Sequence, residues 1–373
     1  MLPPKWEAAF YHTLLNQLIN NLTDMRKRWT IVLITYLASL LLVVGLYANA
    51  YLKLRKTNSF IRLFPPHMLG KQHRIDVGTN AFYIAGIHQD TLYLSNRLDA
   101  RWLKKVNLTN LDTTDLILSW SNMQPPFSDW QVSLQNGILS FSNYLTGTLL
   151  LSSYPFHQPY YEVKLHQPCY KTLPIHPSLL FAKSYNTPLQ SRSIVRLNLD
   201  QSIPQQAYLP PKKPEGVYST DGIFLWNSTY QNLLYLHNFI NSVTMLDSTC
   251  NVQSSHTTID LVDSIKGSII IQQQKETQIQ QVETSLNNSL ATTDQHLVLV
   301  YSKAPSSNQS LAQFRKNATI DIYQLPTFRY LYSFYLPLTP TTTLLDFQLY
   351  NQELYVLTGT ELIQYQLLLP SAR

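Results

Sequence analysis

The feature that most constrains this chain is a stretch of 24 residues without a charged side chain, Trp29–Leu52. As an α-helix with a rise of about 1.5 Å per residue it would be roughly 36 Å long, enough to cross a hydrocarbon core of about 30 Å. A helix in the core of a soluble domain rarely stays apolar on all faces over this length. The stretch therefore predicts one transmembrane helix that contacts the lipid bilayer through residues 29–52. Because the apolar run is long and begins well after Met1, we expect an uncleaved anchor rather than a cleaved signal peptide.

In residues 1–28, bulky apolar side chains recur at every fourth position, which is the spacing of one helical face. They are Trp6, Phe10, Leu14, Leu18 and Leu22. The pattern predicts a short amphipathic helix before the transmembrane segment. Three roles stay open for it: a helix on the bilayer surface, a helix paired with a partner helix, or a solvated lead-in.

The formal net charge of +6 is concentrated around the membrane segment. Residues 1–56 contain seven basic and two acidic residues, a net of +5, which leaves 21 basic and 20 acidic residues in the remainder. A basic excess at membrane edges meets lipid head groups. The charge therefore gives no support for nucleic-acid binding.

Lys and Arg flank both ends of the span, so the rule that the more basic side stays in the cytoplasm nearly cancels. Residues 1–28 hold four of them and residues 53–72 hold five. Early charges usually dominate, so we expect the short N-terminal segment in the cytoplasm and the large domain on the other side. Residues 53–72 include the stiff sequence Phe64-Pro65-Pro66 and are predicted to be a linker.

From residue 73 to residue 373 the chain consists of short alternating segments bounded by Asn, Asp, Gly, Pro and Ser, which predicts an all-β domain of antiparallel strands. A loose repeat joins two such strands across a polar turn at spacings of roughly 45 to 60 residues, typical of four-stranded propeller blades. A domain of about 300 residues accommodates six blades. The repeats cover residues 82–94, 130–141, 179–197, 223–236, 296–323 and 347–357.

The last repeat supplies only three strands, Leu344–Leu349, Leu354–Leu357 and Leu362–Leu367. We expect the strand His73–Val77 to complete this blade, because a closed ring leaves no open sheet edge. The polar segment Gln272–Thr293 is predicted to be a hairpin extension or a mobile loop, with a recognition loop as the alternative.

The blade pattern resembles that of TolB-like six-bladed β-propeller proteins of the bacterial cell envelope. The resemblance covers about residues 75–369 and is carried by the strand pairs Phe82–Asn96, Asp221–Asn238 and Ile320–Pro337. It implies a fold and a compartment, with the large domain in the periplasm and the anchor in the bacterial inner membrane. It implies no active site. The chain departs from the lipoprotein members of this group because it has no lipobox cysteine, and the segment 29–52 takes the place of a lipid anchor.

Sequence motifs for catalysis are absent. The chain has no phosphate-binding glycine loop, no Gly-x-Ser-x-Gly elbow, no His-Glu-x-x-His helix and no haem attachment motif. Catalytic residues are therefore unknown, and no cofactor is expected. The best metal-binding candidates are His157, His166, Cys169 and His176, although their spacing matches no established zinc pattern and solvated loop histidines are the simpler interpretation.

The chain contains two cysteines, Cys169 and Cys250, which is too few to define a disulfide framework. Pairing in an oxidising compartment and two buried free thiols both stay open.

Taken together, these patterns favour a single-pass membrane protein whose propeller is a non-catalytic platform, binding a protein partner or an envelope ligand through its loops. The alternative is a propeller hydrolase or lyase with a site at the mouth of the channel. Several His, Asp or Glu side chains converging at one mouth would favour the enzyme, whereas an apolar or sealed channel would favour the platform.

Overall fold

The computed structural model describes residues 27–50, 60–165, 169–186, 191–199, 203–211, 217–261, 267–270, 278–282, 287–338 and 343–370. It divides into two compact units, Met1–Ser59 and Phe60–Arg373. In the first unit, Lys27–Ala50 is one helix that is long and apolar enough to cross a membrane. The described helix covers residues 29–50 of the predicted span. The predicted amphipathic helix lies outside the described residues, apart from Lys27 and Arg28.

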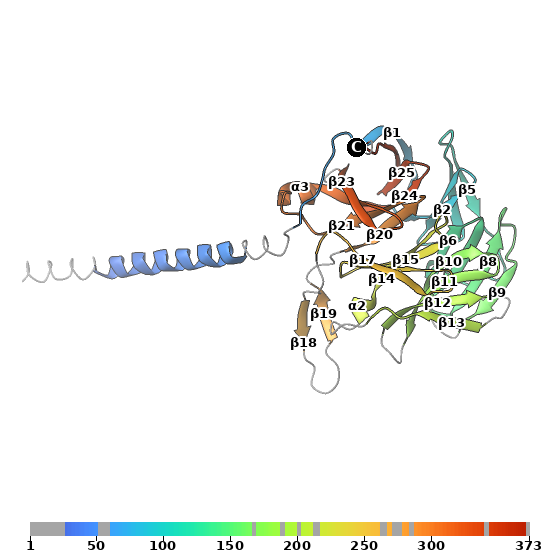
Figure 1. The fold of residues 1–373 in the computed structure, drawn as a ribbon, viewed down its shortest axis with the longest axis horizontal. Helices are drawn as coiled ribbons and strands as arrows, with labels where there is room; N and C mark the ends of the chain where they lie inside the picture. Colours follow the sequence, from blue (N-terminus) through green and yellow to red (C-terminus); the bar gives the residue numbers. More distant parts are fainter. Residues whose placement is uncertain are drawn as a thin grey trace, which may run out of the picture. The chain divides into compact units, whose positions relative to one another are not determined.

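The second unit is a six-bladed β-propeller, as predicted (Figure 1). Each blade is a four-stranded antiparallel sheet. The first three sheets are β2 (Phe82–His88), β3 (Thr91–Asn96), β4 (Trp102–Asn107) and β5 (Thr113–Ile117); β6 (Trp130–Gln135), β7 (Ile138–Asn143), β8 (Thr148–Ser153) and β9 (Tyr161–Lys164); and β10 (Cys169–His176), β11 (Leu179–Asn186), β12 (Ser191–Asn198) and β13 (Ile203–Tyr208).

The other three sheets are β14 (Gly222–Asn227), β15 (Asn232–His237), β16 (Ser242–Leu246) and β17 (Val252–Thr257); β20 (Asn287–Asp294), β21 (Leu297–Ser302), β22 (Asn317–Gln324) and β23 (Arg329–Pro337); and β24 (Leu344–Tyr350), β25 (Glu353–Thr358), β26 (Glu361–Leu367) and β1 (Leu69–Asp76). Among the described residues, three short helical segments lie between strands: the 3-10 helix η1 (Phe127–Asp129), α2 (Val217–Thr220) and α3 (Leu311–Lys316).

The sixth sheet closes the ring with a strand from the start of the domain. Strand β1 pairs antiparallel with β26, and Ile75 lies opposite Leu362. This confirms the predicted closure, although β1 begins at Leu69, before the predicted start at His73. The pairing supplies hydrogen-bond partners to β26, which would otherwise be an exposed sheet edge.

Six buried apolar clusters hold the blades together, and each cluster joins two neighbouring sheets. One of them packs Phe82 and Leu94 of the first sheet against Tyr355 and Leu357 of the sixth. Alternating strands place apolar side chains on both sheet faces here, because each blade is covered by a neighbour on either side. The ring is therefore closed by packing as well as by strand pairing.

The repeats predicted from the sequence mark the first two strands of four blades. In the third and fifth blades they mark the second and third strands instead, because 179–197 is β11 with β12 and 296–323 spans β21 and β22. The first strands of these blades, β10 and β20, face the centre of the ring and are too polar to show the apolar alternation. Part of the predicted insertion was assigned wrongly for the same reason, since β20 includes residues 287–293.

A separate two-stranded hairpin precedes β20. It consists of β18 (Gly267–Ile270) and β19 (Gln278–Val282), with Gly267 paired to Val282. A hairpin was predicted in this region, and it begins before the predicted start at Gln272.

Residues 60–64 pack on the fifth sheet through a buried ion pair. The Arg62 guanidinium donates from Nε and Nη2 to the two Asp321 oxygens at 2.7 and 2.9 Å. It also donates to Ser302, Gln309 and the carbonyl of Ala304. Both side chains of the ion pair are almost fully buried. The chain that follows the apolar helix is therefore tied to the propeller seven residues before β1 begins.

Candidate functional site

The inner strands of all six sheets enclose a central channel. These strands are β2, β6, β10, β14, β20 and β24, and each contacts its neighbours around the ring. The cavity between them has a volume of about 1060 Å³. Both apolar and polar side chains line it, so the channel is not purely apolar.

The two ends of the channel differ in their loops. Because every blade is entered through its inner strand, the connections between blades gather at the end where the inner strands begin, at Phe82, Trp130, Cys169, Gly222, Asn287 and Leu344. We call this the connection end. The opposite end, where the inner strands finish, is the turn end. It carries tight turns such as Gln89-Asp90, Asn136-Gly137 and Asn351-Gln352, whose residues all have positive φ, as type I′ hairpin turns require.

Basic side chains that line the channel lie at the connection end. Strand register places them there: Arg97 follows Asn96, which pairs with Phe82, and Lys183 pairs directly with Lys171. Lys303 follows Ser302, which pairs with Asn287. Each of these side chains lines the cavity. The acidic Asp129 and Asp346 also line the cavity toward the connection end, so both signs of charge are present there. The turn end is lined by Asp294 and His88.

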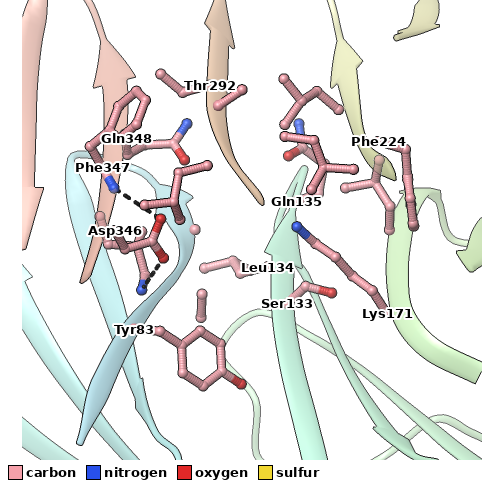
Figure 2. Close-up of a pocket in the computed structure, with 18 of the residues that line it drawn as sticks. Tyr83, Ser133, Leu134, Gln135, Lys171, Phe224, Thr292, Asp346, Phe347 and Gln348 are labelled. Atoms are coloured by element: carbon pink, nitrogen blue, oxygen red, sulfur yellow. Dashed lines mark hydrogen bonds between the residues drawn. The ribbon is translucent and has the colours of Figure 1, made fainter. Parts of the chain in front are cut away.

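Two oppositely charged side chains face the same space within the channel (Figure 2). The Asp346 carboxylate accepts hydrogen bonds from the backbone amides of Ile84 and Phe347, at 3.0 and 2.9 Å. Burial raises the pKa of Asp346, and these amides together with Lys171 oppose the rise. The carboxylate is therefore held in place by backbone donors and not by a direct ion pair.

Lys171, on β10, has no hydrogen bond or ion pair to its ammonium from any residue that the structure describes. The ammonium lies 6.0 Å from the centre of the Phe224 ring. Burial lowers the pKa of Lys171, while the Asp346 carboxylate opposes this and Lys183 adds to it. A cation in this setting favours an anionic partner, because partial desolvation makes the unpaired charge costly.

The neighbouring Lys183 is neutralised within the chain. Its ammonium lies 2.6 Å from an Asp221 oxygen and donates to the carbonyl of Gly222 at 2.6 Å. Burial lowers the pKa of Lys183, and Asp221 opposes that shift. Lys171 and Lys183 are paired neighbours in the sheet. Lys183 has an acidic partner and Lys171 has none among the described residues, so Lys171 is the cation of this pair that a ligand could bind.

An exposed aromatic cluster forms part of the rim at the connection end. The rings of Tyr144 and Tyr170 stack, with centroids 6.4 Å apart and an interplanar angle of 17°. The Arg192 guanidinium lies 4.5 Å from the centre of the Tyr170 ring. Tyr144 and Tyr170 are 40 % and 37 % exposed. We refer to Tyr144, Tyr170 and Arg192 as the rim cluster.

The predicted metal candidates are placed as follows. His157 and His176 are exposed, and His176 Nδ1 lies 3.1 Å from the Ser178 hydroxyl. Cys169 is buried in the core between the second and third sheets. His166 lies outside the described residues. Over the part of the chain that the structure describes, no three His, Cys, Asp or Glu side chains gather in a way that would hold a metal ion.

Cys169 and Cys250 are buried thiols that form no disulfide with each other. They belong to different apolar clusters, Cys169 between the second and third sheets and Cys250 between the third and fourth. Burial raises the pKa of each thiol to about 12. At neutral pH both are therefore unreactive core side chains.

No sequence motif predicted the residues of the channel and the rim. Tyr170, Lys171 and Arg192 belong to the third blade, whereas Tyr144 follows β7 of the second and Asp346 lies on β24 of the sixth, so no local motif contains the whole set. Of these residues, only Lys171 could have been predicted to line the channel, because a lysine in the first strand of a blade is expected to face the centre of the ring. That prediction required the strand β10 to be recognised first.

Comparison with known proteins supports the fold and goes no further. No family model matches the chain, and no curated protein matches it. Among solved structures, a DUF4221 family member from Bacteroides vulgatus is 10 % identical, covers 83 % of this chain and 98 % of its own, and has a TM-score of 0.51. A putative exported protein from Bacteroides fragilis is 10 % identical, with the same coverage and a TM-score of 0.54. At this identity the likeness is one of fold alone.

Proposed function

We propose that the protein is a membrane-tethered, non-catalytic platform of the TolB-like type, which binds a protein partner or an envelope ligand at the connection end of its channel. The observation that carries the proposal is the rim cluster. Stacked tyrosines beside an arginine are typical of the residues that dominate binding energy at interfaces, because they offer large, rigid contact areas at low entropic cost. Here the two tyrosine rings stand exposed on a closed ring, with the partly buried Arg192 beside them.

The proposed location is the bacterial inner membrane, with residues 1–28 in the cytoplasm and the propeller in the periplasm. The helix Lys27–Ala50 supports the anchor by its length and composition. A similar fold in a protein described as exported is compatible with a periplasmic domain. The tether would keep the rim cluster within reach of other membrane proteins.

The binding proposal is tested with a photo-crosslinking residue at Leu145, which is 65 % exposed and adjoins the rim cluster without belonging to it. The matched control carries the same residue at Gln352, an exposed position at the turn end. We expect a discrete adduct in native membranes from position 145 and not from position 352. The adduct should disappear when Tyr144→Ser and Tyr170→Ser are combined.

Equal adducts from both positions, or an adduct that the double variant leaves intact, would contradict the role of the rim. Turnover of a substrate by the purified protein would overturn the non-catalytic assignment and favour the hydrolase or lyase.

The membrane location and orientation are tested with Ser121→Cys, an exposed position in the connection before β6. A maleimide that cannot cross the inner membrane should label this variant in cells with a permeabilised outer membrane. The parent chain supplies a low background, because Cys169 and Cys250 are buried. Labelling only after lysis of the inner membrane would reverse the orientation. Recovery of a soluble chain that lacks residues 27–50 would identify the helix as a cleaved signal.

A further inference from the structure

We propose that the channel holds a second binding site, for a small organic anion whose charged group pairs with Lys171. This goes beyond the proposed function, because the ligand lies inside the ring and not at the rim. The inference rests on the position and surroundings of the Lys171 ammonium. It needs neither a membrane partner nor a particular membrane orientation.

The acidic groups near Lys171 have partners of their own. Asp221 pairs with Lys183 at 2.6 Å and lies 3.7 Å from Arg192. Asp346 accepts two backbone amides. The acidic groups near Lys171 are thus engaged elsewhere, whereas Lys171 has no direct partner among the described residues. A ligand anion would supply the partner that this ammonium lacks.

The Lys171 side chain points into the channel. Figure 2 shows the Lys171 amine pointing into the cavity, beside Phe224 and opposite Asp346. The backbone of Lys171 pairs with Lys183 of β11, directly after a register irregularity between Cys169 and Lys171. A cation on a paired strand, aimed into a cavity of about 1060 Å³, is preorganised for an anion of several non-hydrogen atoms.

Other polar side chains in the cavity could bind the rest of the ligand. The amides of Gln135 and Gln348 face the same cavity, together with Thr292 (Figure 2). Amide groups both donate and accept hydrogen bonds. Asp346 repels a second anionic group but accepts a hydroxyl or ammonium donor. The site therefore fits a molecule with an anionic group at one end and hydrogen-bond donors at the other.

The anionic group has two possible chemistries, a carboxylate or a phosphate, and both form charge-assisted hydrogen bonds with an ammonium. The test therefore uses gluconate, inorganic phosphate and, as the uncharged counterpart of gluconate, glucose. All samples contain the purified full chain in detergent at one ionic strength, set with potassium chloride.

The first measurement is the rate at which an amine-selective reagent modifies Lys171, followed by peptide mass spectrometry. Lys164 is the internal control, because it is exposed on the outer strand β9. We expect gluconate, phosphate or both to slow modification of Lys171 by at least about fivefold while glucose does not, and Lys164 to react at an unchanged rate. Protection by one of the two anions identifies the preferred chemistry.

The second measurement is the thermal midpoint of unfolding. The protecting anion should raise it in the parent chain and in Lys164→Gln, but not in Lys171→Gln. Lys171→Gln is expected to fold, since the substitution breaks no described ion pair.

The inference is overturned if neither anion protects Lys171, if glucose protects it equally, or if Lys164 is protected to the same degree. Because these measurements involve no partner, their failure would leave the crosslinking test at the rim unaffected. Failure of the crosslinking test would equally leave this site standing.

Discussion

At the scale of single residues, the buried Arg62 and the partly buried Lys171 have opposite roles. Arg62 is fully satisfied by Asp321, Ser302, Gln309 and a carbonyl. Lys171 has no direct partner among the described residues and faces a cavity. Paired buried charges are retained for structure, whereas an unpaired charge in a cavity indicates binding.

Replacing Arg62 with Met should lower the free energy of unfolding by about 3–5 kcal/mol, because it leaves the Asp321 carboxylate buried without its cation. Chemical denaturation in detergent measures this. Arg74→Met is the matched control, since Arg74 pairs with Glu361 on the surface and its loss should cost less than about 1 kcal/mol. Adding Asp321→Leu to Arg62→Met should restore part of the stability. A loss at Arg62 no larger than that at Arg74 would contradict the structural role of this ion pair.

Replacing Lys171 with Met should leave stability at pH 7 unchanged or raise it by about 1 kcal/mol, because an ammonium that is partly desolvated is removed. The pKa of Lys171 is lowered in the folded chain, so the unfolded chain binds more protons between the two pKa values. The stability of the parent therefore rises with pH in that window. The advantage of the variant should shrink between pH 7 and pH 10. A constant difference across this range would contradict the lowered pKa.

At the scale of elements, the inner strands are limited by how closely neighbouring backbones approach. Strand β2 has an irregular register between Ile84 and Gly86. A side chain built on Gly86 would lie 2.1 Å from the carbonyl oxygen of Leu134 on β6. The first and second blades therefore meet at a position where only glycine fits.

Gly86→Ala should lower the free energy of unfolding by at least about 2 kcal/mol, because β2 and β6 would have to separate. Gly78→Ala serves as the comparison, since Gly78 also has positive φ but has open space around it, so the cost there is about 1 kcal/mol. Equal losses for the two variants would mean that backbone conformation alone, and not the contact with β6, requires glycine at Gly86.

At the scale of the whole molecule, ring closure is the feature on which all six interfaces depend. Strand β1 completes the sixth sheet, and Ile75 with Val77 enters the cluster between the sixth and first blades. Residues 60–64 add a second attachment to the fifth blade through Arg62. The start of the propeller is thus held on two neighbouring blades.

Three shortened chains separate these contributions. A chain that begins at residue 58 should unfold in one cooperative transition. One that begins at residue 66 keeps β1 but loses Arg62, so its thermal midpoint should fall by several degrees. One that begins at residue 78 exposes the edge of β26 and should aggregate. Size-exclusion chromatography and calorimetry measure these outcomes. A monomeric, cooperative chain starting at residue 78 would show that the other five sheets hold the ring without closure.

The channel side chains show why much of the candidate site lay beyond sequence reasoning. The two blades whose inner strands were missed, the third and fifth, include β10, which carries Lys171, and β20, which includes Thr292. Strands β10 and β20 carry polar residues that interrupt the apolar alternation by which strands are recognised. The inner strand β24 was recognised from its alternation, but no local pattern marks its Asp346 as a channel residue.

The amino-acid sequence by itself determined the apolar helix, the all-β propeller with six blades and the strand that closes it. These depend on local periodicity, turn residues and length, which a chain carries in any conformation. Tertiary structure alone decided that Arg62 meets Asp321, 259 positions away, and that Lys171 faces Asp346 without pairing. Such contacts exist only after six sheets curve into a ring, because closure brings together residues that share no local pattern.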